Sequence, residues 1–465
     1  MNTAINRTFN AANIHKNIAV YPTDDIAGYS ATYGTQDDIH SIVKMLANTA
    51  ALIPLYGYKV VNDSTAKQLG RIRQPHNSMY QAKALQLKAL EDLPDTDRVE
   101  QLLQFPSENQ TQYEFLELIY TFLLLSGEAF ILKERPEIGI NAGLTTQLHI
   151  LFPQNVVIKV SDTLPRKIVA YDYRVNGQLI YDNISPDDII HIKYANPVMD
   201  YNGGELRGLS PLKVLLKRMA RIDANMNLSV AQMQNGGVET IVYDKAIMDG
   251  AAADVAGKRK DSFYRFLKDK TNAGAPYFAT GEMGALHIGS TLADLGVSKL
   301  EQVDFKKLCN VFGTSDILFN NDAGSTESNV KEMIKRTYTN TILPNVYRLR
   351  DALKHELLTE FEKGRKIETV NEVGETVITT VKGDGIKRDI QADISEIPEL
   401  QENYKDMAEW LGKSWWVTPN EKRKMMKFEA IPDTMMDMPL IPQGVQTLEE
   451  LQAIADLPMG TANGN

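Results

Sequence analysis

Arg207-Gly-Leu-Ser-Pro-Leu212 stands immediately before a long helical pattern. Ser210 suits the N-cap, because its hydroxyl can accept a hydrogen bond from a free N–H at the helix start. Pro211 suits the first helical position, where a missing N–H leaves no bond unmade. Apolar residues then recur at helical spacing: Leu212, Leu215, Met219, Ile222, Met226 and Met233. Asn235-Gly-Gly237 ends the pattern, which predicts a helix over residues 209–234.

The same helix carries a cluster of basic residues away from its apolar stripe. These residues are Lys213, Lys217, Arg218 and Arg221. Their spacing of i, i+4, i+5 and i+8 places them on roughly one side of the helix. For an isolated monomer, the simplest interpretation is a solvated face. A role in binding is the alternative that this pattern leaves open.

Before this helix, residues 129–194 change to short β-prone runs. The runs are Phe130–Leu132, Leu148–Phe152, Val156–Val160, Tyr171–Val175, Gln178–Tyr181 and Ile189–Lys193. Asn176-Gly177 predicts a tight hairpin between two of them, because both turn positions need a positive φ. Further upstream, Thr111 and Glu114 form a capping-box pattern for a helix that reaches Leu125. The first 35 residues lack clear periodicity, which predicts an arm rather than a core element.

After this helix, an α/β segment of residues 235–292 precedes a second helix that ends near Phe312. A small polar connector, Asn320–Thr326, leads to the longest helical pattern, from Ser328 to Phe361. Pro344 lies inside that pattern, where it removes one donor and clashes with the preceding turn, so we predict a kink. The chain ends in an acidic tail rich in Pro, Met and Gly, for which we predict flexibility.

The composition of the chain limits the classes of function that are possible. The chain has 465 residues, enough for two or more units, and a formal net charge of -10. This acidity argues against a protein that grips nucleic acid over its whole surface. Cys309 is the only cysteine, which excludes an internal disulfide and a cysteine-based metal site within one chain. The N-terminus lacks the apolar core of a signal peptide, and no apolar run approaches the roughly 20 residues of a membrane span. We expect a soluble, intracellular protein.

Two glycine- or serine-containing motifs lack a residue that catalysis needs. Gly284–Ser290 has the glycine spacing of a phosphate-binding loop, but Ser290 occupies the position of the essential lysine. Ser210 stands where a nucleophile elbow would place its serine, but Pro211 has no N–H to offer an oxyanion hole. We interpret the first motif as a strand-end turn and the second as a helix cap.

Carboxylate and histidine patterns also favour structural roles. Asp187-Asp188 lies between Ser185-Pro186 and a strand, a setting more typical of a solvated turn than of a metal pair. No two of the seven histidines have the i, i+4 spacing of a helical metal site. Histidines at alternating positions in strand-like runs are His149, His191 and His287, and we interpret them as structural. We therefore predict no enzymatic activity, no metal and no cofactor.

Taken in order, the motifs resemble those of portal proteins of tailed bacteriophages, of the type found in many long-tailed phages. The matching segments are His40–Tyr56, Leu102–Phe115, Leu124–Leu132, Asp188–Ile192, Arg207–Leu212, Met233–Gly236, Phe312-Gly313, Ser328–Val330, Ile342–Pro344 and Thr418–Arg423. Asp188–Ile192 and Arg207–Leu212 are the most recognisable pair. The sequence departs from the family after Gly313, where Thr314 and Ser315 stand in place of the usual valine and proline.

The resemblance implies an α+β subunit that assembles into a ring, usually of twelve copies. It divides this chain into residues 1–35 as an N-terminal arm, 36–208 as an α/β wing, 209–234 and 293–313 as two stem helices, 235–292 as a small α/β clip, 314–327 as a tunnel loop, 328–363 as a long kinked wing helix, 364–430 as wing completion or crown, and 431–465 as a flexible acidic tail. We therefore expect these elements to have their roles mainly as parts of an assembled ring.

The family's function is to form a conduit for double-stranded DNA at one capsid vertex during genome packaging and ejection. The partners it implies are non-specifically contacted double-stranded DNA, the terminase large subunit, the head–tail connector or adaptor, and the major capsid or scaffolding protein, with no membrane. The implied location is the portal vertex of the virion, after assembly in the host cytoplasm. A capsid or tail structural protein without a DNA channel is the main alternative. A hydrolase that uses Ser210, or a metal-dependent nuclease that uses Asp187 and Asp188, is disfavoured by the missing partner residues.

The resemblance also suggests which residues meet DNA. We expect the tunnel loop to approach DNA through Asn320, Asn321, Asp322, Ala323, Gly324, Ser325 and Thr326. We expect Lys213, Lys217, Arg218 and Arg221 to lie between subunits or to face the channel. Because each Lys or Arg contact with a phosphate releases counterions and strengthens binding, an acidic protein with narrow basic bands suits DNA that must slide.

Overall fold

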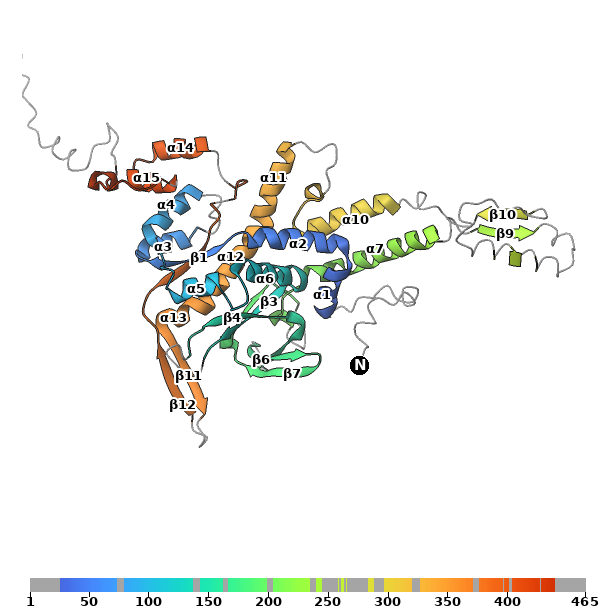
Figure 1. The fold of residues 1–465 in the computed structure, drawn as a ribbon, viewed down its shortest axis with the longest axis horizontal. Helices are drawn as coiled ribbons and strands as arrows, with labels where there is room; N and C mark the ends of the chain where they lie inside the picture. Colours follow the sequence, from blue (N-terminus) through green and yellow to red (C-terminus); the bar gives the residue numbers. More distant parts are fainter. Residues whose placement is uncertain are drawn as a thin grey trace, which may run out of the picture. The chain divides into compact units, whose positions relative to one another are not determined.

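The computed structural model describes residues 26–72, 79–136, 143–161, 166–198, 204–234, 240–244, 258, 261–262, 265, 283–287, 297–319, 327–370, 376–395, 397–400, 404–426 and 428–439. The chain forms two compact units. Unit 1 comprises Met1–Gly28 and Leu212–Asn310, and unit 2 comprises Tyr29–Pro211 and Val311–Asn465. Figure 1 labels their helices and strands.

Two helices in unit 2 bury the largest apolar faces. They are α2 (Asp37–Ala51) and α6 (Gln112–Ser126), and they pack against each other. The predicted capping box is confirmed, because the Thr111 hydroxyl accepts from the backbone of Glu114, whose side chain accepts from the backbone of Thr111. Gly127 ends α6 in the left-handed conformation, with φ 79°, which a residue with a side chain rarely adopts.

Two three-stranded antiparallel sheets follow α6, and all six strands were predicted. One has the order β4-β3-β8 and the other β5-β6-β7. The strands are β3 (Glu128–Glu134), β4 (Gln147–Leu151), β5 (Val156–Val160), β6 (Ile168–Val175), β7 (Gln178–Ile184) and β8 (Ile189–Lys193). Asn176 and Gly177 have φ of 52° and 82°, which confirms the predicted tight hairpin between β6 and β7.

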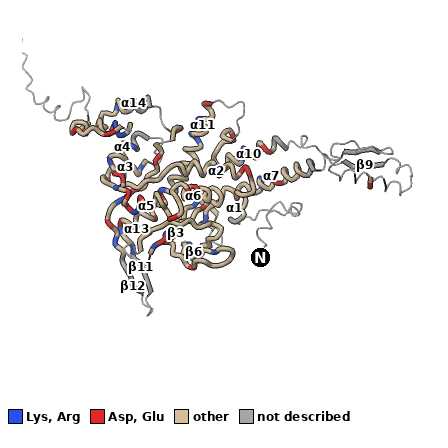
Figure 2. Tube along the Cα trace, in the orientation of Figure 1, with Lys and Arg blue, Asp and Glu red and all other residues tan. Residues whose placement is uncertain are grey.

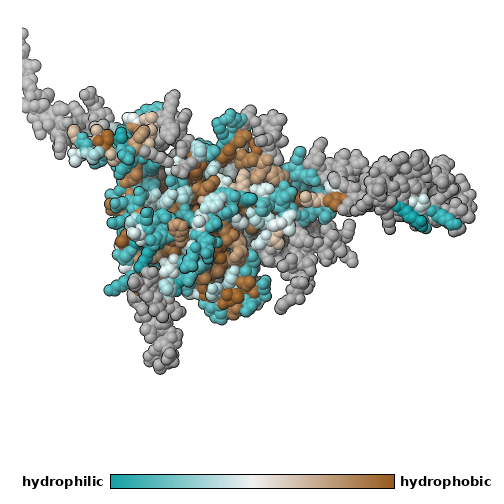
Figure 3. Space-filling view, viewed as in Figure 1, coloured by the Kyte–Doolittle hydropathy of each residue, from teal (hydrophilic) through white to brown (hydrophobic). Residues whose placement is uncertain are grey.

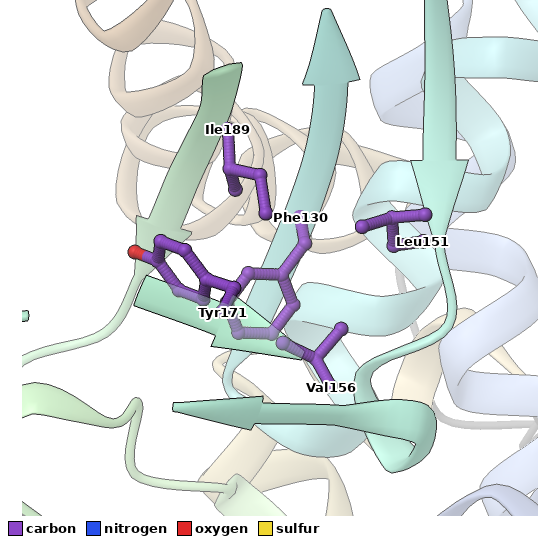
Figure 4. Close-up of a cluster of buried hydrophobic side chains, with 5 residues drawn as sticks. All are labelled: Phe130, Leu151, Val156, Tyr171 and Ile189. Atoms are coloured by element: carbon purple, nitrogen blue, oxygen red, sulfur yellow. The ribbon is translucent and has the colours of Figure 1, made fainter. Parts of the chain in front are cut away.

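The two sheets share one buried cluster (Figure 4). Phe130 of β3 meets Tyr171 of β6 edge to face, with ring centroids 5.9 Å apart. The remaining members, Leu151, Val156 and Ile189, come from β4, β5 and β8. Five strands thus each contribute one buried side chain to this cluster. The cluster holds the two sheets before the long helix against each other.

Other elements of unit 2 lie outside these sheets. They are α1 (Ile26–Thr35), β1 (Leu55–Val60), α3 (Asp63–Gly70), α4 (Met79–Ala89), β2 (Leu90–Asp92), α5 (Arg98–Gln104), β11 (Gly364–Val370), β12 (Thr376–Lys382), β13 (Arg388–Ala392), α14 (Tyr404–Lys413) and α15 (Pro419–Met425). Strand β1 lies between β13 and β2. After the long helix, β11 and β12 pair as an antiparallel hairpin.

The helical run that contains Pro344 is interrupted twice by π-helical turns. It consists of α11 (Glu327–Thr337), a π-turn (Tyr338–Ile342), α12 (Leu343–Leu353), a second π-turn (Lys354–Leu358) and α13 (Thr359–Lys363). Pro344 is the second residue of α12, so the departure from α-helical geometry lies in the turn that leads into it. A widened turn leaves room for the proline ring that a regular turn would clash with. The second π-turn had no signal in the sequence.

Unit 1 contains the second pair of long helices and a hairpin. Helix α7 spans Pro211–Gln234 and α10 spans Val297–Phe312 (Figure 1). Strands β9 (Thr240–Asp244) and β10 (Met283–His287) pair antiparallel. Most of the predicted α/β segment between these two strands lies outside the described residues.

Two predictions about the ends of the chain need correction. The predicted arm of residues 1–35 ends in a helix, α1, whose Tyr29 and Thr32 are buried. Its weakly amphipathic sequence gave no periodic signal. The predicted tail begins with ordered residues, since the Asn420 side chain exchanges hydrogen bonds with the backbone of Ile431 and donates to Asp437. Residues 440–465 lie outside the described residues.

Candidate functional site: a helix pair and its anchor

The backbone of the segment before α7 is in direct contact with the backbone at the junction between α6 and β3. A Cβ added to Gly208 would lie 2.1 Å from the carbonyl oxygen of Gly127. A Cβ on Gly127 would lie 2.4 Å from the carbonyl oxygen of Leu209. Contacts of this length do not occur for real side chains, so both positions require glycine.

A buried carboxylate holds this crossing in place. The Glu128 side chain is 1% exposed and accepts a hydrogen bond of 3.0 Å from the backbone N–H of Gly208. Nε2 of His191 lies 3.3 Å from the same oxygen, Oε2, and the other oxygen, Oε1, accepts from Nε of Arg207 at 2.8 Å. We call Gly127, Glu128, His191, Arg207 and Gly208 the helix anchor. Glu128 of β3 thus holds Arg207 and Gly208, just before α7, and also contacts His191 of β8.

The electrostatics of the helix anchor favour a charged Glu128 beside a neutral His191. Burial works to raise the pKa of Glu128, but hydrogen bonds with His191 and Arg207 and the charge of Arg207 hold that pKa below its ordinary value. Burial lowers the pKa of His191, and the nearby carboxylate only partly offsets this effect. The imidazole also stacks on Phe130, with ring centroids 4.3 Å apart. His191 therefore has the structural role that its place in a strand predicted.

Ser210 is the last residue before α7, and its side chain is buried. Its hydroxyl donates a hydrogen bond to the carbonyl oxygen of Leu125 in α6. Pro211 is the first residue of α7, as predicted. The hydroxyl of Ser210 thus ties the segment before α7 to the end of α6. Its role as a helix cap stays a prediction.

Helices α7 and α10 are joined by a buried ion cluster. Asp304 of α10 has a side chain that is 1% exposed. Arg221 of α7 donates to both of its oxygens, with Nε 3.1 Å from Oδ2, and Arg218 donates to Oδ1 through Nη1. We call these three residues the stem triad. Hydrogen bonds with Asp304 raise the pKa of Arg221 above its ordinary value.

The two remaining predicted basic residues, Lys213 and Lys217, are exposed on α7. The predicted apolar stripe of this helix is buried at Leu212, Leu215, Met219 and Ile222, whereas Met226 is 47% exposed. The four basic residues of the predicted cluster thus comprise two that contact a buried carboxylate and two whose side chains are exposed.

Helices α7 and α10 are basic within an acidic chain. Their seven Lys and Arg residues against three Asp and Glu residues leave four net positive charges, whereas the whole chain carries -10. Figure 2 shows both signs of charge on these helices. This helix pair therefore carries a net positive charge although the chain as a whole is acidic.

Asp187-Asp188 lie in a turn, as predicted, and Asp187 is exposed, but the sequence did not predict the ion pairs of the half-buried Asp188. Its carboxylate binds Arg135 and lies 2.9 Å from Arg365. Arg135 also binds Glu360, with 2.6 Å between Nη2 and Oε2. The turn residues Pro186–Asp188 are thus joined to β3, β11 and α13, through contacts between residues far apart in the sequence.

The remaining predicted site residues belong to none of these clusters or lie outside the described residues. Asn320–Thr326 lie outside the described residues, so the expectation that they meet DNA stays a prediction. Gly284 lies within β10 opposite Tyr243, so the chain there is a paired strand. His149 is an exposed residue whose Nε2 lies 2.5 Å from Glu134.

Among the described residues, three of the ion clusters that the sequence did not predict are centred on the buried Glu128, Arg135 and Asp304. Each combines residues separated by 53 to 225 positions. The sequence contained a partial signal for the cluster centred on Glu128, because its members Arg207 and Gly208 directly precede the start of a predicted helix. Among the described residues, no group of three or more His, Cys, Asp or Glu side chains is placed to hold a metal. The described helices also include none with the length and apolar character needed to cross a membrane.

The fold is a mixed helix-and-strand one that is similar to chains of gene transfer agent particles. A chain in the neck of an empty gene transfer agent particle, computed with C6 symmetry, aligns over 88% of this chain and 94% of its own length, with a TM-score of 0.55 and 19% identity. A chain of the native gene transfer agent virion aligns over the same shares, with a TM-score of 0.54 and 19% identity. A chain from the neck of the native particle, computed with C12 symmetry, covers 89% and 96%, also with a TM-score of 0.54 and 19% identity.

The sequence gives the family directly. The model of the phage portal protein family matches residues 83–426, and the chain belongs to that family. No curated protein matches the chain. The family is a structural, non-enzymatic one.

Proposed function

We propose that this chain is the subunit of a ring-shaped conduit for double-stranded DNA at one vertex of a capsid. In this proposal the ring serves genome packaging and ejection, docks the terminase large subunit, and later binds the head–tail connector. Family membership carries the proposal. The net positive charge of α7 and α10 supports it, because DNA must be attracted to a passage without being held by the whole surface.

The proposed division assigns α7 and α10 to the stem and the intervening residues 235–292 to the clip. The division of the described chain at residues 211 and 310 is compatible with this assignment. Residues 314–327 would form the tunnel loop, and 328–363 the wing helix above it. Lys213 and Lys217 would face the channel or a neighbouring subunit.

An apolar edge strand supports assembly into a ring. Strand β7 lies at one edge of its sheet. Leu179, Ile180 and Tyr181 on this strand are 42–50% exposed, and Figure 3 shows apolar surface in the region of β6 and β7. Exposed apolar edge strands are prone to association, so a protein benefits from covering them. In the proposed ring, a neighbouring subunit would cover this strand.

Negative-stain images of the purified protein, alone and with capsid and scaffolding proteins, test the proposal. We expect closed rings with an open axis. Shells or tubes without such rings would favour a capsid or tail structural protein that has no DNA channel.

The tunnel loop can be tested separately. Deletion of residues 320–326 should leave rings intact while it reduces packaging or DNA retention, because short polar side chains are expected to touch phosphates at the constriction. Packaging and retention are measured by nuclease protection of the encapsidated DNA. Unchanged values in particles with intact rings would contradict this role.

A further inference from the structure

The stem triad binds two cations to one anion at a buried position. Both oxygens of Asp304 are engaged by the fork of Arg221, and Oδ1 also accepts from Arg218. The two arginine side chains still reach the surface, because they are 29% and 46% exposed. A guanidinium that is bound to a carboxylate has fewer free donors and less net charge to offer a phosphate.

We infer that Asp304 limits the grip of the helix pair on DNA by holding Arg218 and Arg221 away from phosphates. This inference rests on the proposed function and assigns one residue as a regulator of sliding. The exposed Lys213 and Lys217 then supply the attraction of α7 for DNA. Loss of the Asp304 charge would release two arginines that lie on the same helix as these lysines.

The direct test is Asp304→Asn, which keeps the shape of the side chain and removes its charge. Binding of the assembled protein to a fluorescent 30-base-pair duplex is measured by anisotropy over a series of salt concentrations. Each additional phosphate neutralised steepens the dependence of log K on log salt by about 0.9. We expect tighter binding, with the slope steeper by up to about 1.8 for each subunit in contact.

Glu301→Gln is the matched control. Glu301 lies one turn before Asp304 on α10, is exposed, and loses the same unit of charge when it is substituted. It does not belong to the stem triad, so its substitution should change the slope by less than half as much. Equal slopes for the two variants would overturn the inference, because net charge alone would then explain the effect. The triple variant Asp304→Asn, Arg218→Gln, Arg221→Gln should return to wild-type affinity, and continued tight binding would also overturn it.

A second pair of variants keeps the inference testable if Asp304→Asn does not fold. Lys217→Gln and Arg221→Gln each remove one cation from α7, one turn apart. Lys217→Gln should lower the salt slope by about 0.9 for each subunit in contact, whereas Arg221→Gln should leave it unchanged. Equal effects would refute the inference. Rings in electron micrographs of the same samples separate this outcome from failure of the proposed function, since a ring without the slope difference contradicts only the inference.

Discussion

Substitution of Gly208 by alanine should destabilise unit 2 severely. The added methyl would lie 2.1 Å from the carbonyl oxygen and 2.7 Å from the carbonyl carbon of Gly127. Both atoms are backbone, so no side-chain rotation relieves the clash. The segment must move by about 1 Å or more to reach ordinary van der Waals contact.

That movement disrupts hydrogen bonds at the start of α7. The N–H of Gly208 loses its 3.0 Å hydrogen bond to the buried carboxylate of Glu128. Overpacking of a dense interior costs about 1–3 kcal/mol, and a hydrogen bond to a charged group contributes about 1.5–3 kcal/mol. We therefore expect the free energy of unfolding to fall by about 4 kcal/mol.

Tryptophan fluorescence in urea measures this loss. The chain's three tryptophans, Trp410, Trp415 and Trp416, all belong to unit 2, so the signal reports on the unit that contains Gly208. With a urea dependence of about 3 kcal/mol per molar, the midpoint should fall by about 1.3 M. Gly70→Ala, whose new methyl would meet nothing within 4 Å, is the matched control and should leave stability equal or slightly higher. A loss below about 1 kcal/mol for Gly208→Ala would refute the close approach of the two backbones.

Two further predictions concern buried charge in unit 2. Because burial lowers the pKa of His191, the unfolded state binds a proton that the folded state does not, so stability should fall as the pH drops below about 6.5. Urea midpoints between pH 7.5 and 5 should show this fall in the wild type and a smaller one in His191→Gln; equal falls would contradict the assignment. Arg135→Gln leaves the buried Glu360 without its arginine and should cost about 3 kcal/mol in the same assay, whereas Lys413→Gln, which breaks an exposed pair, should be neutral. A neutral Arg135→Gln would show that Thr145 alone satisfies Glu360.

Local signals in the sequence predicted much of the fold. The hairpin at Asn176-Gly177 depends only on the positive φ of these two residues. The start of α6 depends only on the capping box between Thr111 and Glu114, three residues apart. Such features need no knowledge of the rest of the chain. The six strands of the two central sheets were predicted for the same reason, since β-prone runs bounded by turns mark a strand wherever it pairs.

The remaining features depend on contacts that periodicity cannot reveal. Glu128 and Arg207 are separated by 79 positions, and nothing near Glu128 marks it as buried. Asp188 was interpreted as a solvated residue because its neighbours in sequence are turn residues, although its partner Arg365 is 177 positions away. The π-turn before Pro344 was missed because proline predicts only that the helix departs from regular geometry, and leaves open how.

The stem triad also bears on why a helix pair should contain buried charge at all. An apolar stripe such as Leu215, Met219 and Ile222 stabilises packing, but it tolerates displacement of one helix along another because its residues are alike. A single buried carboxylate that accepts from two arginines one turn apart does not tolerate such a displacement. Moving one helix by a turn would leave the carboxylate unpaired, at a cost of about 3–5 kcal/mol. Buried ion pairs contribute little net stability, yet they can fix register. Asp304 thus has two consequences from one position: it sets how α7 and α10 align, and it withholds two positive charges from whatever passes along them.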